Sequence, residues 1–110
     1  MVLLYTKKEI KMTIEHIVLL KFKEQLTEEK QQEVVARFKD IQNEIPGIVS
    51  MSAGIDFSGR SKGFSIGAVI RFEDEAALKV YGPHEAHQGF IKFIKENGHE
   101  DTLVVDFPLS

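Results

Sequence analysis

The sequence contains no cysteine and no tryptophan, and only 3 of its 110 residues are proline. Without cysteine the chain forms neither a disulfide framework nor a thiolate nucleophile, and a zinc site would need histidine and carboxylate ligands. This fits a reducing compartment. With 43% hydrophobic and 28% charged residues, the chain has the composition of a globular protein that folds by burying its own core.

Positive charge and long hydrophobic runs are also scarce. The formal net charge is −3, and basic and acidic residues are interleaved, so we expect no face that attracts a nucleic-acid backbone. The apolar run 2–5 is too short for a signal peptide, and no segment reaches the length of a membrane span. We therefore expect a cytoplasmic protein that binds neither nucleic acid nor membranes.

The length fits a single domain. Met12 directly precedes a strongly strand-forming segment, whereas residues 1–11 differ in character from the rest of the chain. We expect Met12 to be the usual first residue, residues 1–11 to be an N-terminal extension and residues 12–110 to be the domain.

Hydrophobic periodicity and turn residues divide the chain into strands and helices. Strands are predicted over 14–22, 48–57, 64–72 and 102–107. Thr27 caps a predicted helix that ends before Pro46-Gly47, and a second helix over 73–96 is interrupted at Gly82-Pro83. The order β-α-β-β-α-β predicts a ferredoxin-like α+β fold, with a four-stranded antiparallel sheet and helices on one face.

The first predicted strand is apolar on both faces. Ile17 and Leu19 point away from the face expected to meet the helices. An uncovered apolar sheet face predicts an interface, and two such sheets facing each other in a homodimer would close a barrel. In the second strand we expect one side to be formed by Val49, Met51, Ala53, Ile55 and Phe57.

Several short motifs resemble a known family. They are Glu15-His16-Ile17-Val18-Leu19-Leu20-Lys21-Phe22, Ile45-Pro46-Gly47, Gly63-Phe64, Tyr81 followed by His84-Glu85-Ala86-His87, and Val105-Asp106-Phe107. In this order, over Thr13 to Pro108, they resemble the stress-responsive A/B barrel domain, or dimeric α+β barrel, family. The resemblance implies a homodimer whose sheets face each other. It implies less about activity, because many members are known mainly as stress-associated proteins.

Tyr81 and His87 are the candidate catalytic residues. The resemblance implies this, since a plant polyketide cyclase of the family uses a tyrosine and a histidine in the matching segment for an aldol-type condensation. The chemistry is sound, because a neutral imidazole can remove a proton next to a carbonyl while a phenol donates a hydrogen bond to the enolate oxygen. The alternative is structural: Tyr81 caps the edge of the core, and His87 bonds to backbone or water.

A ligand cavity between sheet and helices is expected around this pair. Its predicted lining comprises His16, Val18, Leu20, Ile66, Ala68, His84, Phe90 and Asp106. A core histidine satisfied by a hydrogen bond is the alternative interpretation of His16, and the candidate partner of Asp106 is the phenol or imidazole across the cavity. In the cyclase the position matching Ile66 is a histidine, which moves our expectation from catalysis toward binding.

No metal and no cofactor are expected. His84 and His87 stand three positions apart with Glu85 nearby, but two ligands do not make a zinc site, and His99 is expected to be a solvated loop residue. Three hypotheses remain: a dimer that binds a small, partly apolar molecule; a cofactor-independent cyclase or isomerase; and a structural dimer without a ligand. Haem-degrading and cofactor-independent monooxygenases are a more distant alternative, which the absence of tryptophan disfavours.

Overall fold

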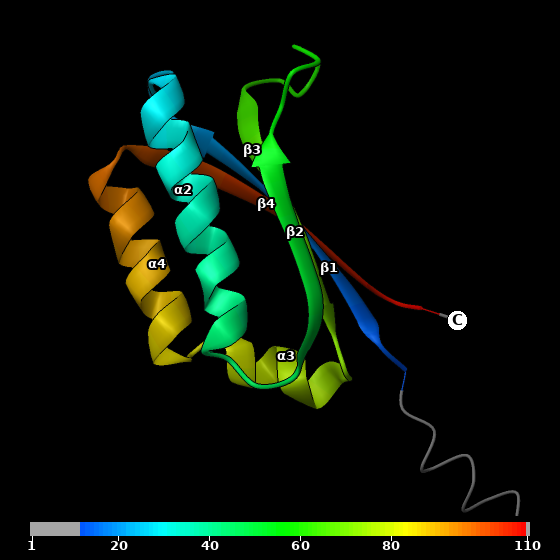
Figure 1. Cartoon of the computed structure of the whole chain (residues 1–110). Helices are drawn as coiled ribbons and strands as arrows, with labels where there is room; N and C mark the ends of the chain where they lie inside the picture. The colour runs from blue at the N-terminus through cyan, green and yellow to red at the C-terminus, as the bar shows by residue number, and fades with distance from the viewer. Residues whose placement is uncertain (1–11, 110) are drawn as a thin grey trace, which may run out of the picture.

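A four-stranded sheet carries helices on one face and leaves the other face bare (Figure 1). The computed structural model describes residues 12–109; the predicted extension, residues 1–11, lies outside them. Its elements are β1 (Ile14–Phe22), α2 (Glu28–Asp40), η1 (Ile41–Asn43), β2 (Ile48–Ile55), β3 (Phe64–Phe72), α3 (Glu75–Tyr81), α4 (Glu85–Glu96) and β4 (His99–Pro108).

The strands lie in the order β2-β3-β1-β4, and all neighbours are antiparallel. Strands β2 and β3 form the predicted hairpin, and β1 lies between β3 and β4. Helices α2 and α4 lie side by side over the sheet, and α3 lies at one end of it (Figure 1). The ferredoxin-like prediction is confirmed, with the second helix divided in two as expected.

Local chemistry explains where the helices begin and end. The Thr27 hydroxyl accepts a hydrogen bond from the Lys30 N–H at 3.1 Å, and the Asp74 carboxylate accepts one from the Ala77 N–H at 2.8 Å. Gly47 adopts a φ of 90°, and a Cβ there would lie 2.6 Å from the Cβ of Ala77. Only glycine therefore fits the turn that leads from η1 into β2 while α3 packs against it.

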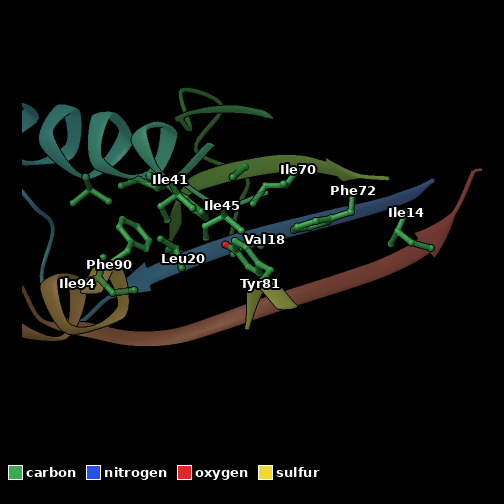
Figure 2. Packing of buried hydrophobic residues seen from close by; sticks show 14 of the residues in the cluster. Ile14, Val18, Leu20, Ile41, Ile45, Ile70, Phe72, Tyr81, Phe90 and Ile94 are labelled. Carbon is green, nitrogen blue, oxygen red and sulfur yellow. The ribbon is translucent and has the colours of Figure 1, made fainter. Parts of the chain in front are cut away.

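The core is one continuous layer between sheet and helices (Figure 2). The apolar residues Val34, Phe38, Ile41 and Ile45, spaced by four, three and four along α2, η1 and the turn after them, are buried. They pack on the inner face of the sheet, whose buried residues are Ile14, His16, Val18, Leu20, Phe22, Ile66, Ala68, Ile70 and Phe72. The alternating apolar residues of β1 and β3 therefore form the inner face of the sheet, which meets the helices.

Strand β2 departs from the expected alternation. Its register with β3 shifts between Ile48 and Ser50, so Val49 is an extra residue and 55% exposed. Ile48 packs against the core in its place. Phe57 lies beyond the end of β2 and is fully exposed. The prediction that Val49 and Phe57 lie on one side of the strand with Met51, Ala53 and Ile55 was wrong, because a bulge and an early strand end are not visible in a simple alternation.

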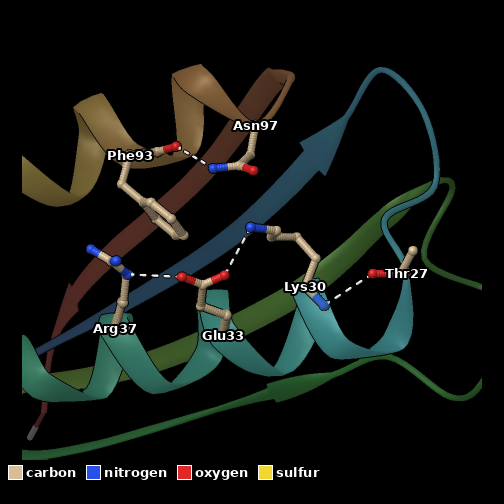
Figure 3. Close-up of polar contacts among 6 residues, drawn as sticks. All are labelled: Thr27, Lys30, Glu33, Arg37, Phe93 and Asn97. Carbon is tan, nitrogen blue, oxygen red and sulfur yellow. Dashed lines mark hydrogen bonds and ion pairs between the residues drawn. The ribbon is translucent and has the colours of Figure 1, made fainter.

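A polar and aromatic cluster joins α2 to α4 (Figure 3). Glu33 accepts from Lys30 Nζ at 2.8 Å and lies 3.4 Å from Arg37 Nε. The Arg37 guanidinium lies over the Phe93 ring, 4.1 Å from its centroid, and Asn97 Nδ2 donates to the Phe93 carbonyl at 2.8 Å. These contacts add to the stacking of Phe38 on Phe90, whose centroids are 4.5 Å apart. The two helices thus pack as one layer.

The opposite face of the sheet is apolar over its centre. Ile17 and Leu19 of β1 are only partly buried, as predicted, and they pair with Val105 and Leu103 of β4, which are 56% and 49% exposed. Val69 of β3 extends this outer face on the other side of Ile17. No helix within residues 12–109 has both the length and the apolar character needed to cross a membrane.

Truncation of Phe38 should destabilise the fold strongly. The side chain is 2% exposed and stacks on Phe90, so Phe38→Ala removes a large, well-packed core side chain and should lower the free energy of unfolding by about 3–5 kcal/mol. Urea denaturation measures the change. Phe57→Ala removes the same ring from a fully exposed site and should cost no more than about 0.5 kcal/mol. Equal losses in the two variants would contradict a core centred on Phe38.

Candidate active site

A cavity of about 320 Å³ lies between β1, β4 and the helices. We call it the Tyr81–His87 cavity. Its lining is His16, Val18, Leu20, Phe38, Leu78, Tyr81, Gly82, His87, Phe90, Ile91, Ile94, His99, Thr102 and Val104. Val104 is 48% exposed, so the cavity opens to solvent along the β4 edge. Its size and its apolar wall with a few polar groups are those of a small-molecule site.

A larger hollow of about 750 Å³ lies at the end of the sheet, beside Met12, Asp74 and Pro108. None of the three polar rings His16, Tyr81 and His87 lines it. Asp106 does line it, and Leu78 lines both hollows. This hollow is the larger of the two. The Tyr81–His87 cavity is nevertheless the better candidate for the active site, because groups able to transfer a proton or donate to a ligand converge there.

The Gly82-Pro83 break brings Tyr81 and His87 together. Helix α3 ends at Tyr81 and α4 begins at Glu85, so the chain turns between the two side chains. Their ring centroids are 4.2 Å apart, with an angle of 37° between the planes. His84 does not line the cavity: its Nδ1 accepts from the Ala86 N–H at 3.0 Å and caps α4. Without the break, residues six positions apart would point to different sides of one helix.

His87 is held in one neutral tautomer. Its Nδ1–H donates to the Gly82 carbonyl at 2.8 Å, because a carbonyl oxygen can only accept. The neutral ring therefore carries its lone pair on Nε2. Burial lowers the pKa of His87 below its ordinary value, and His16 and His84 lower it further, while the bond to Gly82 works in the opposite direction. The imidazole is consequently a neutral, proton-accepting group near pH 7.

The Tyr81 ring contacts two of the three histidines that line the cavity, His16 and His87. Tyr81 is 3% exposed and lies over β1 close to Val18 (Figure 2). Its ring meets that of His16 edge to face at 5.6 Å, in addition to its contact with His87. Burial raises the pKa of its phenol well above the usual range. Tyr81 therefore keeps its proton at physiological pH and can act only as a neutral hydrogen-bonding group.

His16 and Asp106 form a cross-strand pair. They face each other in the β1–β4 register, and His16 Nδ1–H donates to Asp106 Oδ1. The His16 side chain is 10% exposed and that of Asp106 is 38% exposed. The carboxylate thus orients the imidazole, which itself lines the cavity. The phenol or imidazole across the cavity was the expected partner of Asp106; the partner is instead His16, on the neighbouring strand β1.

The predicted lining divides into residues that meet in the cavity and residues that do not. His16, Val18, Leu20, Tyr81, His87 and Phe90 line it. Ile66 and Ala68 do not: they are 0% and 4% exposed and fill the core, so they form no wall of the cavity. An inward-facing side chain fills space when neighbours pack against it from every direction, and alternation alone does not reveal this.

His99 and Thr102 are lining residues that the sequence did not indicate. His99 was expected in a solvated loop, but β4 begins there, and its ring meets that of Phe22 edge to face at 6.1 Å. His99 Nε2 lies 2.6 Å from Thr102 Oγ1. Thr102 faces the cavity because it pairs with Leu20, a register that only the folded sheet defines. Within residues 12–109 no group of three His, Asp or Glu side chains has the geometry to hold a metal ion.

A sheet with helices on one face, an apolar opposite face and a cavity containing imidazole and phenol groups defines a ferredoxin-like α+β domain of the barrel-forming class. Residues 14–109 match the family model described as Stress responsive A/B Barrel Domain, and the chain belongs to this family. The resemblance seen in the sequence is thereby confirmed.

Curated relatives include one named enzyme. Olivetolic acid cyclase from Cannabis sativa is 30% identical over 81 residues, which cover 72% of this chain and 80% of the cyclase. A stress-response A/B barrel domain-containing protein from Arabidopsis thaliana is 28% identical over 96 residues, 86% of this chain. Those residues are 36% of the Arabidopsis protein, so the chain spans only about a third of that relative.

Solved structures share the fold over nearly the whole chain. A hydroxynitrile lyase from Passiflora edulis has a TM-score of 0.76 and 20% identity, covering 92% of this chain and 96% of the lyase. A protein of unknown function from Thermobifida fusca, described as dimeric and ferredoxin-like, has a TM-score of 0.76 and 21% identity, covering 90% of this chain and 92% of its own. At these identities the likeness establishes the fold.

The lowered pKa of His87 should make the free energy of unfolding depend on pH. Its folded pKa lies below the ordinary value of 6.5, so the unfolded chain binds more protons in that window and the free energy of unfolding falls as the pH drops through it. His87→Gln lacks the titrating group and should show a flatter dependence. Urea unfolding at intervals from about pH 7.5 to about pH 5 measures both slopes. Identical slopes for the wild type and the variant would rule out a buried, neutral His87.

Proposed function

We propose that this chain binds a small, partly apolar carbonyl compound in the Tyr81–His87 cavity and transfers a proton at the carbon next to the carbonyl. The observation that carries the proposal is the bond from His87 Nδ1–H to the Gly82 carbonyl, 2.8 Å long. It leaves the Nε2 lone pair of a neutral imidazole beside a buried phenol. Relatives named as a cyclase and a lyase support an activity of this kind.

The proposed step needs no cofactor. His87 Nε2 accepts the proton from the carbon acid, and the C–H electron pair becomes the C=C bond of an enolate. The carbonyl π electrons move to oxygen, where the Tyr81 O–H donates a hydrogen bond to the developing negative charge. The apolar wall lowers the local dielectric constant, so this hydrogen bond is stronger than in solution. A cyclase would then add the enolate carbon to a second carbonyl group. A lyase would use a comparable proton transfer to break a bond.

His16 is assigned a positioning role in this proposal. Asp106 fixes its ring orientation, and the edge of the ring contacts Tyr81 with centroids 5.6 Å apart. The rings of His16 and His87 both contact the Tyr81 ring, so together they would hold the phenol in the orientation in which its O–H donates to the carbonyl oxygen.

Binding without turnover is the second candidate. The resemblance to the family matches Ile66 with a histidine of the cyclase. In this chain Ile66 is completely buried and does not line the cavity. Strand β3 therefore adds no titratable group to this site. A protein of this kind would carry or sequester the carbonyl compound that it binds.

Two substitutions distinguish catalysis from binding. His87→Gln removes the base and Tyr81→Phe removes the hydrogen-bond donor, so each should lower turnover roughly 100-fold or more in a screen of carbonyl substrates. Binding measured by calorimetry should change much less. Lys92→Ala, an exposed position on α4, is the control and should keep the wild-type rate. Unchanged turnover in His87→Gln would exclude His87 as the base, and wild-type binding without turnover would favour the carrier.

We also propose that the outer apolar face pairs with a second copy of the chain. Val105 is 56% exposed on this face, so Val105→Asp should convert a dimer to a monomer in multi-angle light scattering at micromolar concentration, because burying the new carboxylate is costly. Val80→Asp, at a 49% exposed valine of α3, is the control and should leave the dimer intact. A wild-type monomer would contradict the proposal.

A further inference from the structure

The Tyr81–His87 cavity has a second polar end. His99 and Thr102 line it and bond to each other, with 2.6 Å between Nε2 and Oγ1. They lie near the start of β4, whereas Asp106, which bonds to His16, lies near its end. The proposed proton transfer uses only the His16, Tyr81 and His87 end, so the His99–Thr102 pair has no role in it.

The wall between the two ends is apolar. Val18 and Leu20 of β1 form its floor together with Val104 of β4, and Phe90 and Ile94 of α4 cover it. Thr102 pairs with Leu20 and Asp106 with His16, so the polar ends sit at opposite ends of one continuous stretch of the β1–β4 ladder. These five side chains of the middle stretch are hydrocarbon and offer a ligand no hydrogen bond.

The distance between the ends follows from strand geometry. Thr102 pairs with Leu20, which is four positions along β1 from His16, and at ~3.4 Å per residue this is roughly 14 Å. A chain of single bonds advances ~1.3 Å per bond, since Cα atoms three bonds apart are ~3.8 Å apart, so roughly ten atoms span the gap. An unbranched molecule of this length reaches both polar ends at once.

We propose that the substrate is an unbranched chain with a carbonyl group at the His87 end and a hydroxyl group, roughly ten atoms away, at the His99–Thr102 end. This rests on the proposed function and names its substrate class. A hydroxyl matches the pair in either tautomer of His99. If Thr102 donates to Nε2, its oxygen still accepts from the ligand; if Nε2–H donates to Thr102, the threonine proton is free to bond to the ligand.

A terminal carboxylate does not fit the same place. Among the described residues, 12–109, none of those that line the cavity is lysine or arginine. A carboxylate there would give up part of its hydration without gaining an ion pair, and this is costly. A plain alkyl end would leave the Thr102 hydroxyl facing hydrocarbon. The polar pair therefore selects for a neutral hydroxyl.

A matched pair of ligands tests the inference by calorimetry. The probes are decan-2-one and 10-hydroxydecan-2-one, which differ only in the terminal hydroxyl. The wild type should bind the hydroxyketone about fivefold more tightly, the effect of one buried hydrogen bond. Thr102→Val keeps the shape of the side chain but lacks its hydroxyl, and His99→Phe keeps the ring; each should abolish the preference while retaining decan-2-one affinity. Ser50→Ala, which removes an exposed hydroxyl of β2, should keep it.

The outcomes separate this inference from the proposed function. Equal affinity of the wild type for the two ketones, or a preference that persists in both Thr102→Val and His99→Phe, would overturn the second polar subsite and leave carbonyl binding in place. Binding of neither ketone would overturn both. A preference lost in the two cavity variants and kept in Ser50→Ala supports the assignment.

Discussion

The pairing of β1 between β3 and β4 is the constraint on which the other parts of the molecule depend. This strand is apolar on both faces, so its inner residues require the helices while Ile17 and Leu19 require a second cover. Its position in the sheet also sets what faces His16: Ile70 on one side and Asp106 on the other. Core, outer face and the first polar group of the cavity thus follow from one nine-residue strand.

The chemistry depends in turn on an interruption. A continuous second helix would bury Tyr81 and His87 on different sides, and the Gly82-Pro83 turn instead supplies a free carbonyl that fixes the tautomer of His87. The same turn frees His84 to cap α4. The break in the helix therefore places an oriented base, His87, beside the protonated phenol of Tyr81. Burial shifts the pKa of each group so that its uncharged form is favoured.

Much of the fold, and part of the cavity, could be predicted from the sequence. The alternation of apolar residues in β1 and β3 and their helical spacing from Val34 to Ile45 can be seen in the sequence, and they report directly on burial. The bulge at Val49 was not predicted, because one inserted residue changes the face without changing composition. Thr102 was missed because its direction depends on pairing with Leu20, and Ile66 was misjudged because inward alternation does not distinguish packing from lining.

The His16–Asp106 bond also bears on how β4 finds its alignment. The segment Leu103-Val104-Val105 is apolar on both faces, so hydrophobicity alone would accept the edge strand shifted by one residue. Such a slip would place Val105 opposite His16 and turn Asp106 to the outer face, opposite the carboxylate of Glu15. The buried imidazole would lose its partner and the carboxylate of Asp106 its donor. One polar pair at the end of the sheet thus distinguishes the native alignment of an otherwise ambiguous strand from its nearest competitor.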